Sequence, residues 1–136
     1  MAPDPAQLRW FVDESLMGVG KALSWARKDT VHSGHPQIAG APAGAPDVEW
    51  MPVVATAGLV VIGRDKRIRT KPAEVATLRS HGLRVFYLTG PKDMQSWDYI
   101  TVLVRRWDDM EARVQQRGPG PWFMSVTTSG VRELMV

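Results

Sequence analysis

Short apolar runs rich in β-branched and aromatic residues alternate along this chain with segments of helical periodicity, and this alternation limits its fold more than any other feature. The expected strands cover residues 9–12, 30–34, 59–63 and 83–90. The expected helices cover residues 16–28, 71–82 and 95–117, with a further helix that begins at Asp47 and ends at Gly58. Strands joined through helices favour an α/β fold with a mainly parallel central sheet and right-handed crossovers.

The run "LVVIG" at residues 59–63 is almost continuously apolar, as expected for a central strand of a parallel sheet that is buried on both faces. The segments "WFMSVTT" and "VRELMV", separated by Ser129 and Gly130, predict a hairpin at the end of the chain. The Pro-, Gly- and Ala-rich segment 35–46 is predicted to be a loop. Because no internal repeat or second core is present, residues 1–136 are expected to form a single domain.

Composition excludes some classes of function. The chain has no cysteine, which excludes disulfides and thiolate metal sites and permits a reducing compartment. The amino-terminal residues lack the basic and apolar regions of a signal peptide, and the longest apolar region, 51–63, is too short to span a bilayer. We therefore expect a soluble cytoplasmic protein with no membrane association. The net charge of +3 is compatible with a polyanionic partner and does not by itself indicate one.

Acidic residues follow the expected strands at positions where ligands bind in open α/β sheets, beyond the carboxyl ends of the strands. Asp13 follows the first strand, Asp65 follows the central strand, and Asp47 opens the helix that leads back to that edge. Glu14 and Glu49 are close to two of them in sequence. Clustered carboxylates repel one another, and Mg²⁺ or Mn²⁺ with its preference for oxygen ligands would remove the conflict.

A basic run surrounds the third of these acids. Its members are Arg64, Lys66, Arg67, Arg69 and Lys71. Beside a metal ion that activates water, these cations would hold the phosphates of a nucleic-acid backbone. Spacing alone leaves another interpretation open, because aspartates at strand ends commonly serve as turn or cap residues and basic runs are commonly solvated. His32 and His35 have the spacing of metal ligands but no patterned third ligand, which favours a role in local packing.

The same residues resemble a known family. The segments that carry the resemblance are "FVDESLMG", "APDVEWMPVVATAGLVVIGRDKRIRTKPAE", "LRVFYLTG" and "GPGPWFMSVT". Together they resemble the PIN-like domains of the VapC toxin type, over nearly the whole chain and in the right order. The resemblance implies a three-layer PIN-like fold, Mg²⁺- or Mn²⁺-dependent ribonuclease activity, an RNA substrate and a cognate antitoxin protein. It implies that Asp13, Asp47 and Asp65 are the catalytic metal ligands, and that Ser15 supports the first of them.

The chain departs from the family pattern in two places. The central strand ends in Gly63-Arg64-Asp65 without the usual threonine, and residues 30–46 contain no acid where larger PIN domains carry one. Either Glu14 or Glu49 substitutes for that acid, or three carboxylates suffice. The remaining alternative is a non-catalytic PIN-like module that binds RNA or a protein. Exposed edge strands and the terminal hairpin also make a homodimer plausible.

Overall fold

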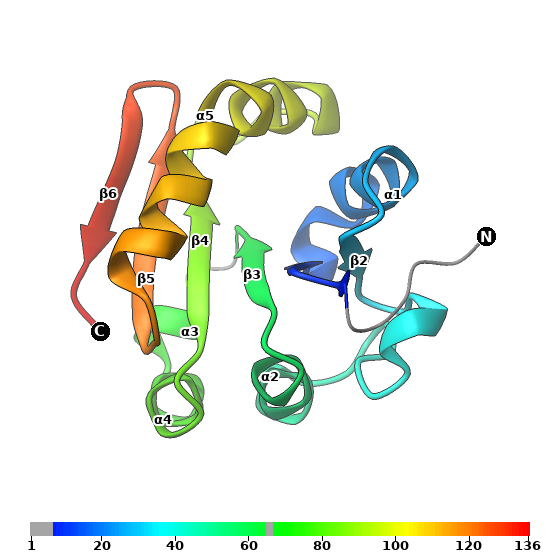
Figure 1. The fold of residues 1–136 in the computed structure, drawn as a ribbon, viewed down its shortest axis with the longest axis vertical. Coiled ribbons are helices and arrows are strands. Elements are labelled where there is room, and N and C mark those ends of the chain that lie inside the picture. Colours follow the sequence, from blue (N-terminus) through cyan, green and yellow to red (C-terminus); the bar gives the residue numbers. More distant parts are fainter. Residues whose placement is uncertain (1–6, 65–66) are drawn as a thin grey trace.

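The computed structural model describes residues 7–64 and 67–136 as one six-stranded sheet with helices on both faces (Figure 1). The strands are β1 (Trp10–Val12), β2 (Thr30–His32), β3 (Val60–Gly63), β4 (Arg84–Leu88), β5 (Trp122–Thr127) and β6 (Gly130–Leu134). The helices are η2 (Glu14–Leu16), α1 (Met17–Ala26), η3 (Pro36–Ile38), α2 (Asp47–Thr56), α3 (Arg67–Thr70), α4 (Pro72–Ser80) and α5 (Ser96–Arg117).

The sheet order is β2-β1-β3-β4-β5-β6, and every neighbouring pair is parallel except the antiparallel β5–β6 hairpin. This arrangement confirms the expected α/β fold with its mainly parallel sheet and terminal hairpin. The first helical segment is divided into the 3₁₀ turn η2 and helix α1, and a second 3₁₀ turn, η3, lies within the expected loop 35–46.

The helix expected over residues 71–82 is present as α4, and the structure adds the short helix α3 before it. Residues 67–70 form the short helix α3, and Lys71 then leaves the helical conformation with φ −80° and ψ 129°. Pro72 explains the break, because the proline ring disfavours a helical conformation of the residue before it. Proline at the first position of α4 is in turn well suited to start that helix.

Pro52 does not interrupt α2, although it lies inside that helix. A proline there cannot donate a hydrogen bond to the carbonyl of Val48, four residues earlier. Val48 lies in the first turn of the helix and is exposed, so the missing hydrogen bond falls at the solvent-facing beginning of α2. Pro46 precedes the helix and Asp47 is its first residue, which places the carboxylate at the helix entrance as expected.

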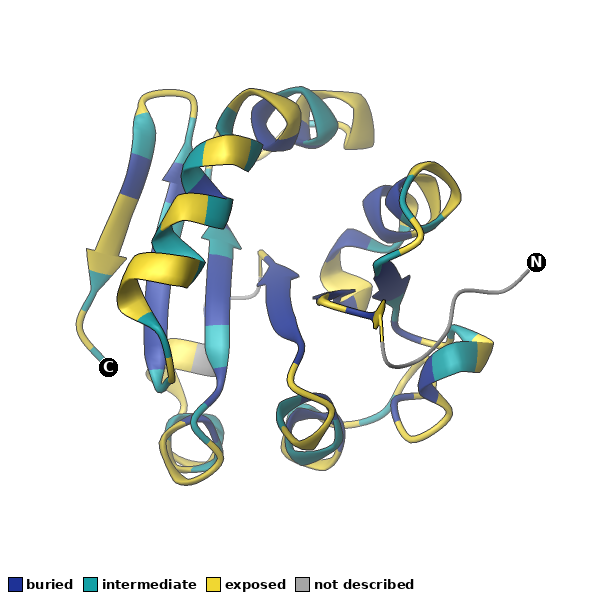
Figure 2. Ribbon diagram, viewed as in Figure 1, coloured by how far each residue is buried: buried dark blue, intermediate teal, exposed yellow. Residues whose placement is uncertain are grey.

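Two apolar cores lie on opposite faces of the sheet, and the central strand β3 between them is buried along its length (Figure 2). Trp10 of β1 packs with residues of α1 and α5, whereas Phe11 packs against Trp50 of α2, with ring centroids 5.1 Å apart. Both faces of β1 and β3 are buried, which explains why these strands read as continuous apolar runs. The sheet therefore has an α1/α5 face and an α2/α4 face.

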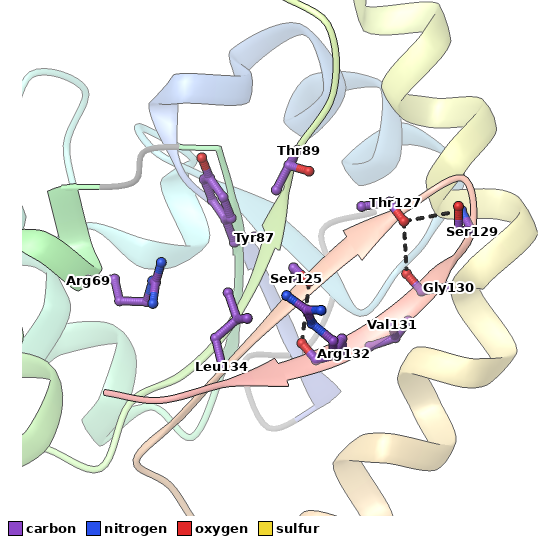
Figure 3. A pocket seen from close by; sticks show the side chains of 10 residues that line it. All are labelled: Arg69, Tyr87, Thr89, Ser125, Thr127, Ser129, Gly130, Val131, Arg132 and Leu134. Atoms are coloured by element: carbon purple, nitrogen blue, oxygen red, sulfur yellow. Dashed lines mark hydrogen bonds between the residues drawn. The ribbon is translucent and has the colours of Figure 1, made fainter.

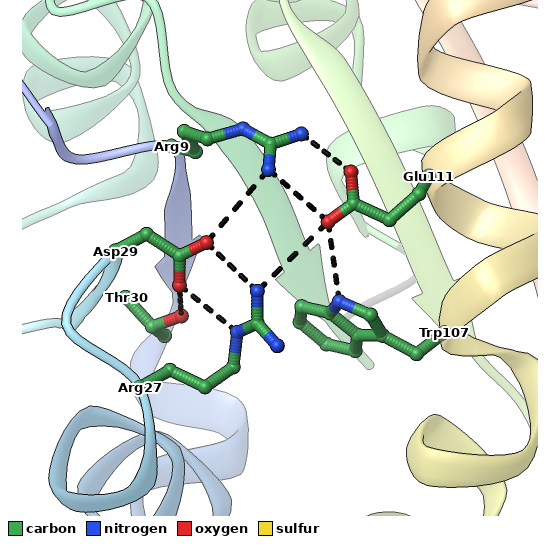
Figure 4. Close-up of polar contacts among 6 residues, drawn as sticks. All are labelled: Arg9, Arg27, Asp29, Thr30, Trp107 and Glu111. Carbon is green, nitrogen blue, oxygen red and sulfur yellow. Dashed lines mark hydrogen bonds and ion pairs between the residues drawn. The ribbon is translucent and has the colours of Figure 1, made fainter.

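A charged cluster closes the amino edge of the strands (Figure 4). Arg27 makes a bidentate pair with Asp29, with nitrogen–oxygen distances of 2.9 Å and 2.8 Å, immediately before β2. Arg9, immediately before β1, pairs with Glu111 of α5. The Arg27 guanidinium also lies 4.5 Å from the ring centroid of Trp107 on the same helix. The cluster therefore joins α5 to the beginnings of two strands.

No helix within the described residues has the length and apolar character needed to cross a bilayer.

Candidate functional site

The side chain of Asp13 lies at the opposite edge of the sheet, where β1 ends. Its backbone N–H donates to the carbonyl of Ile62 at 3.0 Å, which continues the β1–β3 pairing by one residue. The residue is only 4% exposed. Its carboxylate lies against Gly63, where an added Cβ atom would be 2.5 Å from Asp13 Oδ2. Glycine at this position therefore provides the space that the carboxylate occupies.

Ser15 fixes the orientation of that carboxylate. Its backbone N–H donates to Asp13 Oδ1 at 2.8 Å, and its hydroxyl group donates to the same oxygen. The hydroxyl oxygen accepts a third hydrogen bond from the backbone N–H of Arg64 at 3.0 Å. Ser15 therefore connects the turn after β1 to the first residue after β3. Hydrogen bonds of this kind are expected to hold the first acid in place.

Asp47 lies at the entrance of α2 and is half-buried. Its Oδ1 accepts a hydrogen bond of 3.0 Å from the indole N–H of Trp50, whose ring packs on Phe11 of β1. Glu14, the residue after the first acid, accepts a hydrogen bond from the backbone N–H of Gly44 at 2.8 Å. This contact brings the loop before α2 to the end of β1. The first two predicted acids therefore belong to segments that meet at the same edge of the sheet.

The third predicted acid, Asp65, lies outside the described residues together with Lys66 and the side chain of Arg67. Among the residues that are described, no three His, Cys, Asp or Glu side chains gather closely enough to hold a metal ion. The three-aspartate site therefore stays a prediction. The side chains predicted to bind the ion suit it, because Mg²⁺ and Mn²⁺ prefer oxygen ligands such as carboxylates. Gly63 leaves room for the Asp13 carboxylate at the edge of the sheet.

The described members of the basic run point in different directions. Arg64 lies 5.3 Å from the ring centroid of Tyr99, on the α1/α5 face of the sheet. Arg69 of α3 lies 5.8 Å from the ring centroid of Phe123, on the α2/α4 face. Lys71 is exposed between α3 and α4. Arg69 therefore lies on the same face as Tyr87, which is paired with Gly63 beside the Asp13 carboxylate.

The two histidines pack together at the end of β2. Their rings contact edge to face with centroids 5.1 Å apart. His35 Nδ1 accepts a hydrogen bond of 3.1 Å from the backbone N–H of Gln37 at the start of η3. Burial, with a smaller contribution from the charge of His32, lowers the pKa of His35. The capping contact of His35 agrees with the expected role in local packing.

The family comparison adds a further observation to this geometry. The family model described as "PIN like domain" matches residues 8–90, which is more than half of the chain. The chain belongs to the PIN-like domain family. The matched segment of this PIN-like domain begins just before β1 and ends just after β4, so it includes all three predicted acids. No curated protein matches the chain, and no solved structure matches it either.

Two residues of this PIN-like domain have positioning roles that sequence analysis did not assign. Gly63 admits the Asp13 carboxylate, and Trp50 orients Asp47. A signal for each is present in the sequence. Gly63 ends an apolar strand two residues before an acid. Trp50 follows the helix-opening Asp47 by three residues, a spacing that places two side chains on one side of a helix. Glu49, one of the two alternatives predicted to substitute for the missing acid, is exposed in the first turn of α2.

Proposed function

We propose that this PIN-like domain is a Mg²⁺- or Mn²⁺-dependent endoribonuclease that acts as the toxin of a VapC-type toxin–antitoxin pair. The observation that carries the proposal is the Asp13 carboxylate, buried at the carboxyl edge of the sheet, oriented by Ser15 and accommodated by Gly63. A buried, oriented acid at this edge is typical of a ligand site in an α/β sheet. Membership of a family of nuclease-type modules supports the same conclusion.

In this proposal Asp13, Asp47 and Asp65 hold the metal ion. When bound, the ion would lower the pKa of a water molecule and offset the charge that develops on the phosphoryl group. Ser15 keeps one oxygen of Asp13 engaged in two hydrogen bonds, so the carboxylate presents a fixed orientation. Trp50 does the same for Asp47 through a single hydrogen bond. The protein would thus supply a preorganised set of oxygen ligands.

The substrate and partners follow from the same proposal. The basic run would neutralise backbone phosphates next to the cleavage site; its members are Arg64, Lys66, Arg67, Arg69 and Lys71. The cognate antitoxin would cover this site, and the protein would act in the cytoplasm. The two outer strands of the sheet, β2 and β6, offer edges through which a homodimer could form.

A cleavage assay with metal-ligand variants tests the proposal. The wild-type protein is expected to cleave labelled single-stranded RNA with Mn²⁺ and to lose cleavage when EDTA is added. Asp13→Asn and Asp65→Asn are expected to show no cleavage above background while retaining the wild-type circular dichroism spectrum. Asp108→Asn, at an exposed position of α5, is the matched control and should cleave normally. Equal cleavage by the wild type and Asp13→Asn would contradict the proposal.

The second candidate is a non-catalytic PIN-like module that binds RNA or a protein. The observation that favours it is the absence of any acid from residue 30 to residue 46. Thermal unfolding with Mn²⁺ separates the two, because an ion that binds only the folded state stabilises it by about 1.4 kcal/mol at ten times its Kd. The nuclease is expected to gain this stability and Asp13→Asn is not. A wild-type protein that binds RNA but is not stabilised by Mn²⁺ would support the non-catalytic module.

A further inference from the structure

A groove of about 680 Å³ lies on the α2/α4 face of the sheet, between α3 and the β5–β6 hairpin (Figure 3). Arg69 of α3 lies on one side of it and Arg132 of β6 on the other, with Tyr87 and Ser125 between them. Further hydroxyl groups come from threonines at the carboxyl ends of β4 and β5. The groove is therefore lined by two cations and several hydroxyl groups.

The charge of this groove is not neutralised within the described part of the protein. No acidic side chain among the described residues lines it, and neither Arg69 nor Arg132 makes an ion pair with a described residue. The guanidinium of Arg69 lies over the ring of Phe123, which packs in turn on Tyr87 with centroids 5.5 Å apart. Two unneutralised guanidinium groups and the Tyr87 ring in one groove suit a ligand that carries both anionic groups and planar rings.

The register of the sheet connects this groove to Asp13. The β1–β3 pairing places Asp13 beside Gly63, which is paired with Tyr87 of β4. Tyr87 is paired with Ser125 of β5, and Ser125 with Arg132 of β6. Paired residues project from the same face of a sheet, so these five positions form one row across it. With strands about 4.8 Å apart, the row extends about 19 Å from the candidate catalytic acid to Arg132.

We infer that this row is a track for single-stranded RNA, along which Arg69 and Arg132 bind successive backbone phosphates and lead the strand to Asp13. The inference rests on the proposed function, because the strand is led towards Asp13 only if Asp13 is part of the cleavage site. The hydroxyl groups of Tyr87 and Ser125 can donate to phosphate oxygens and accept from ribose hydroxyls. The Tyr87 ring adds a surface on which a base can stack.

An acidic peptide would share the anionic groups but not the planar bases that the Tyr87 ring can stack on. The distinguishing observation is therefore the combination of Tyr87 with the two cations in one groove. A 10-residue polyglutamate peptide provides the competing ligand in the experiment that follows. If that peptide binds through Arg132 and RNA does not, the RNA track is overturned in favour of a protein-docking site.

The test is the binding of a fluorescein-labelled 12-nucleotide RNA, measured by anisotropy in EDTA so that no cleavage occurs. Arg132→Ala is expected to weaken binding about tenfold, the loss typical of one hydrogen bond to a charged group. The slope of log affinity against log salt should become shallower by about 0.7 when one phosphate contact to a single strand is lost. Arg105→Ala is the matched control, because it removes one exposed arginine from α5 on the other face and should bind as the wild type does.

Binding and cleavage separate the failure of this inference from that of the proposed function. Asp13→Asn should retain RNA binding in EDTA, since Arg69 and Arg132, the residues that bind the phosphates in this inference, are unchanged. With Mn²⁺, Arg132→Ala should lower kcat/KM for the 12-nucleotide RNA and leave a four-nucleotide RNA unaffected. A wild type that binds RNA but does not cleave it would refute the nuclease and leave the track intact. Equal RNA binding by the wild type and Arg132→Ala, or no binding by either, would overturn the track.

Discussion

Gly63 and the carboxylate of Asp13 occupy one small space at the edge of the sheet, because a Cβ atom at position 63 would lie 2.5 Å from Asp13 Oδ2. Asp13 is buried and held by Ser15, so it has little freedom to move aside. The pair therefore links the end of β3 directly to the proposed metal ligand.

Gly63→Ala is expected to displace the Asp13 carboxylate. Overpacking of this kind typically costs about 1–3 kcal/mol of folding free energy, which urea unfolding would measure. Loss of an oriented ligand should weaken Mn²⁺ binding about 10- to 100-fold, measured by titration calorimetry. Gly90→Ala is the control, because its added methyl group meets only the flexible side chain of Met94. Wild-type Mn²⁺ affinity in Gly63→Ala would show that the carboxylate does not bind the ion.

Removing the Ser15 hydroxyl should reduce both stability and activity. The hydroxyl donates to Asp13 and accepts from the Arg64 backbone, so Ser15→Ala loses two hydrogen bonds. We expect the free energy of unfolding to fall by about 1–2 kcal/mol, and the affinity for Mn²⁺ to fall with it. Ser15→Thr retains the hydroxyl at an exposed position and should recover most of the affinity. Failure of threonine to recover more than alanine would assign the effect to something other than the hydroxyl.

Trp50→Phe tests the orientation of the second acid. Phenylalanine retains an aromatic ring against Phe11 but cannot donate the indole hydrogen bond to Asp47. A hydrogen bond to a charged group contributes about 1.5–3 kcal/mol, and part of that loss should be visible as a lower Tm. RNA cleavage should decline while RNA binding in EDTA remains unchanged. A variant that cleaves at the wild-type rate would show that Asp47 needs no support from the indole.

Asp29 predicts a pH dependence of stability at the other edge of the sheet. Burial raises the pKa of Asp29, but hydrogen bonds from Arg27 and Thr30 and the charges of Arg27 and Arg9 outweigh it and lower the pKa below its ordinary 3.8. The folded state therefore binds this proton less readily than the unfolded state does. The resulting stabilisation is present above pH 3.8 and is lost as the pH falls through the lower folded-state pKa.

Asp29→Asn should accordingly be less stable than the wild type near neutral pH, by about 1 kcal/mol for a partly exposed pair. The difference should shrink as the pH falls below the ordinary pKa of the carboxyl group. Thermal unfolding from pH 7 to pH 2.5 would measure it, with Asp108→Asn as an exposed control of the same charge change. A difference that persists unchanged at the lowest pH would point to lost packing rather than lost charge.

Sequence patterns predicted the order of the elements. They also predicted that Asp13 follows a strand, because the apolar run ends where the buried strand ends, and that Asp47 begins a helix. Local chemistry also explains why α3 and α4 are separate helices, because Pro72 disfavours a helical conformation at Lys71. The contacts that orient the acids were not predictable. The hydrogen bond from Arg64 to Ser15 depends on the register between β1 and β3.

The proposed RNA track could not be predicted from the sequence either, because it also depends on the register between strands. Arg132 lies 119 positions after Asp13 in the printed sequence, and only the pairing of five strands places both in one row. The hairpin was predicted from its turn, but a turn does not specify which face each side chain occupies on the finished sheet. Asp65 and Lys66 lie outside the described residues, so their proposed roles stay predictions.

The family match ends at residue 90, yet β5 lies against β4 and contributes Trp122 and Phe123 to opposite cores. Glu111 of α5 likewise pairs with Arg9 before the first strand. The recognisable PIN-like segment therefore shares both cores and the sheet with residues beyond it. A fragment that stopped there would present β4 as a bare apolar edge, and such an edge invites pairing with other chains and aggregation.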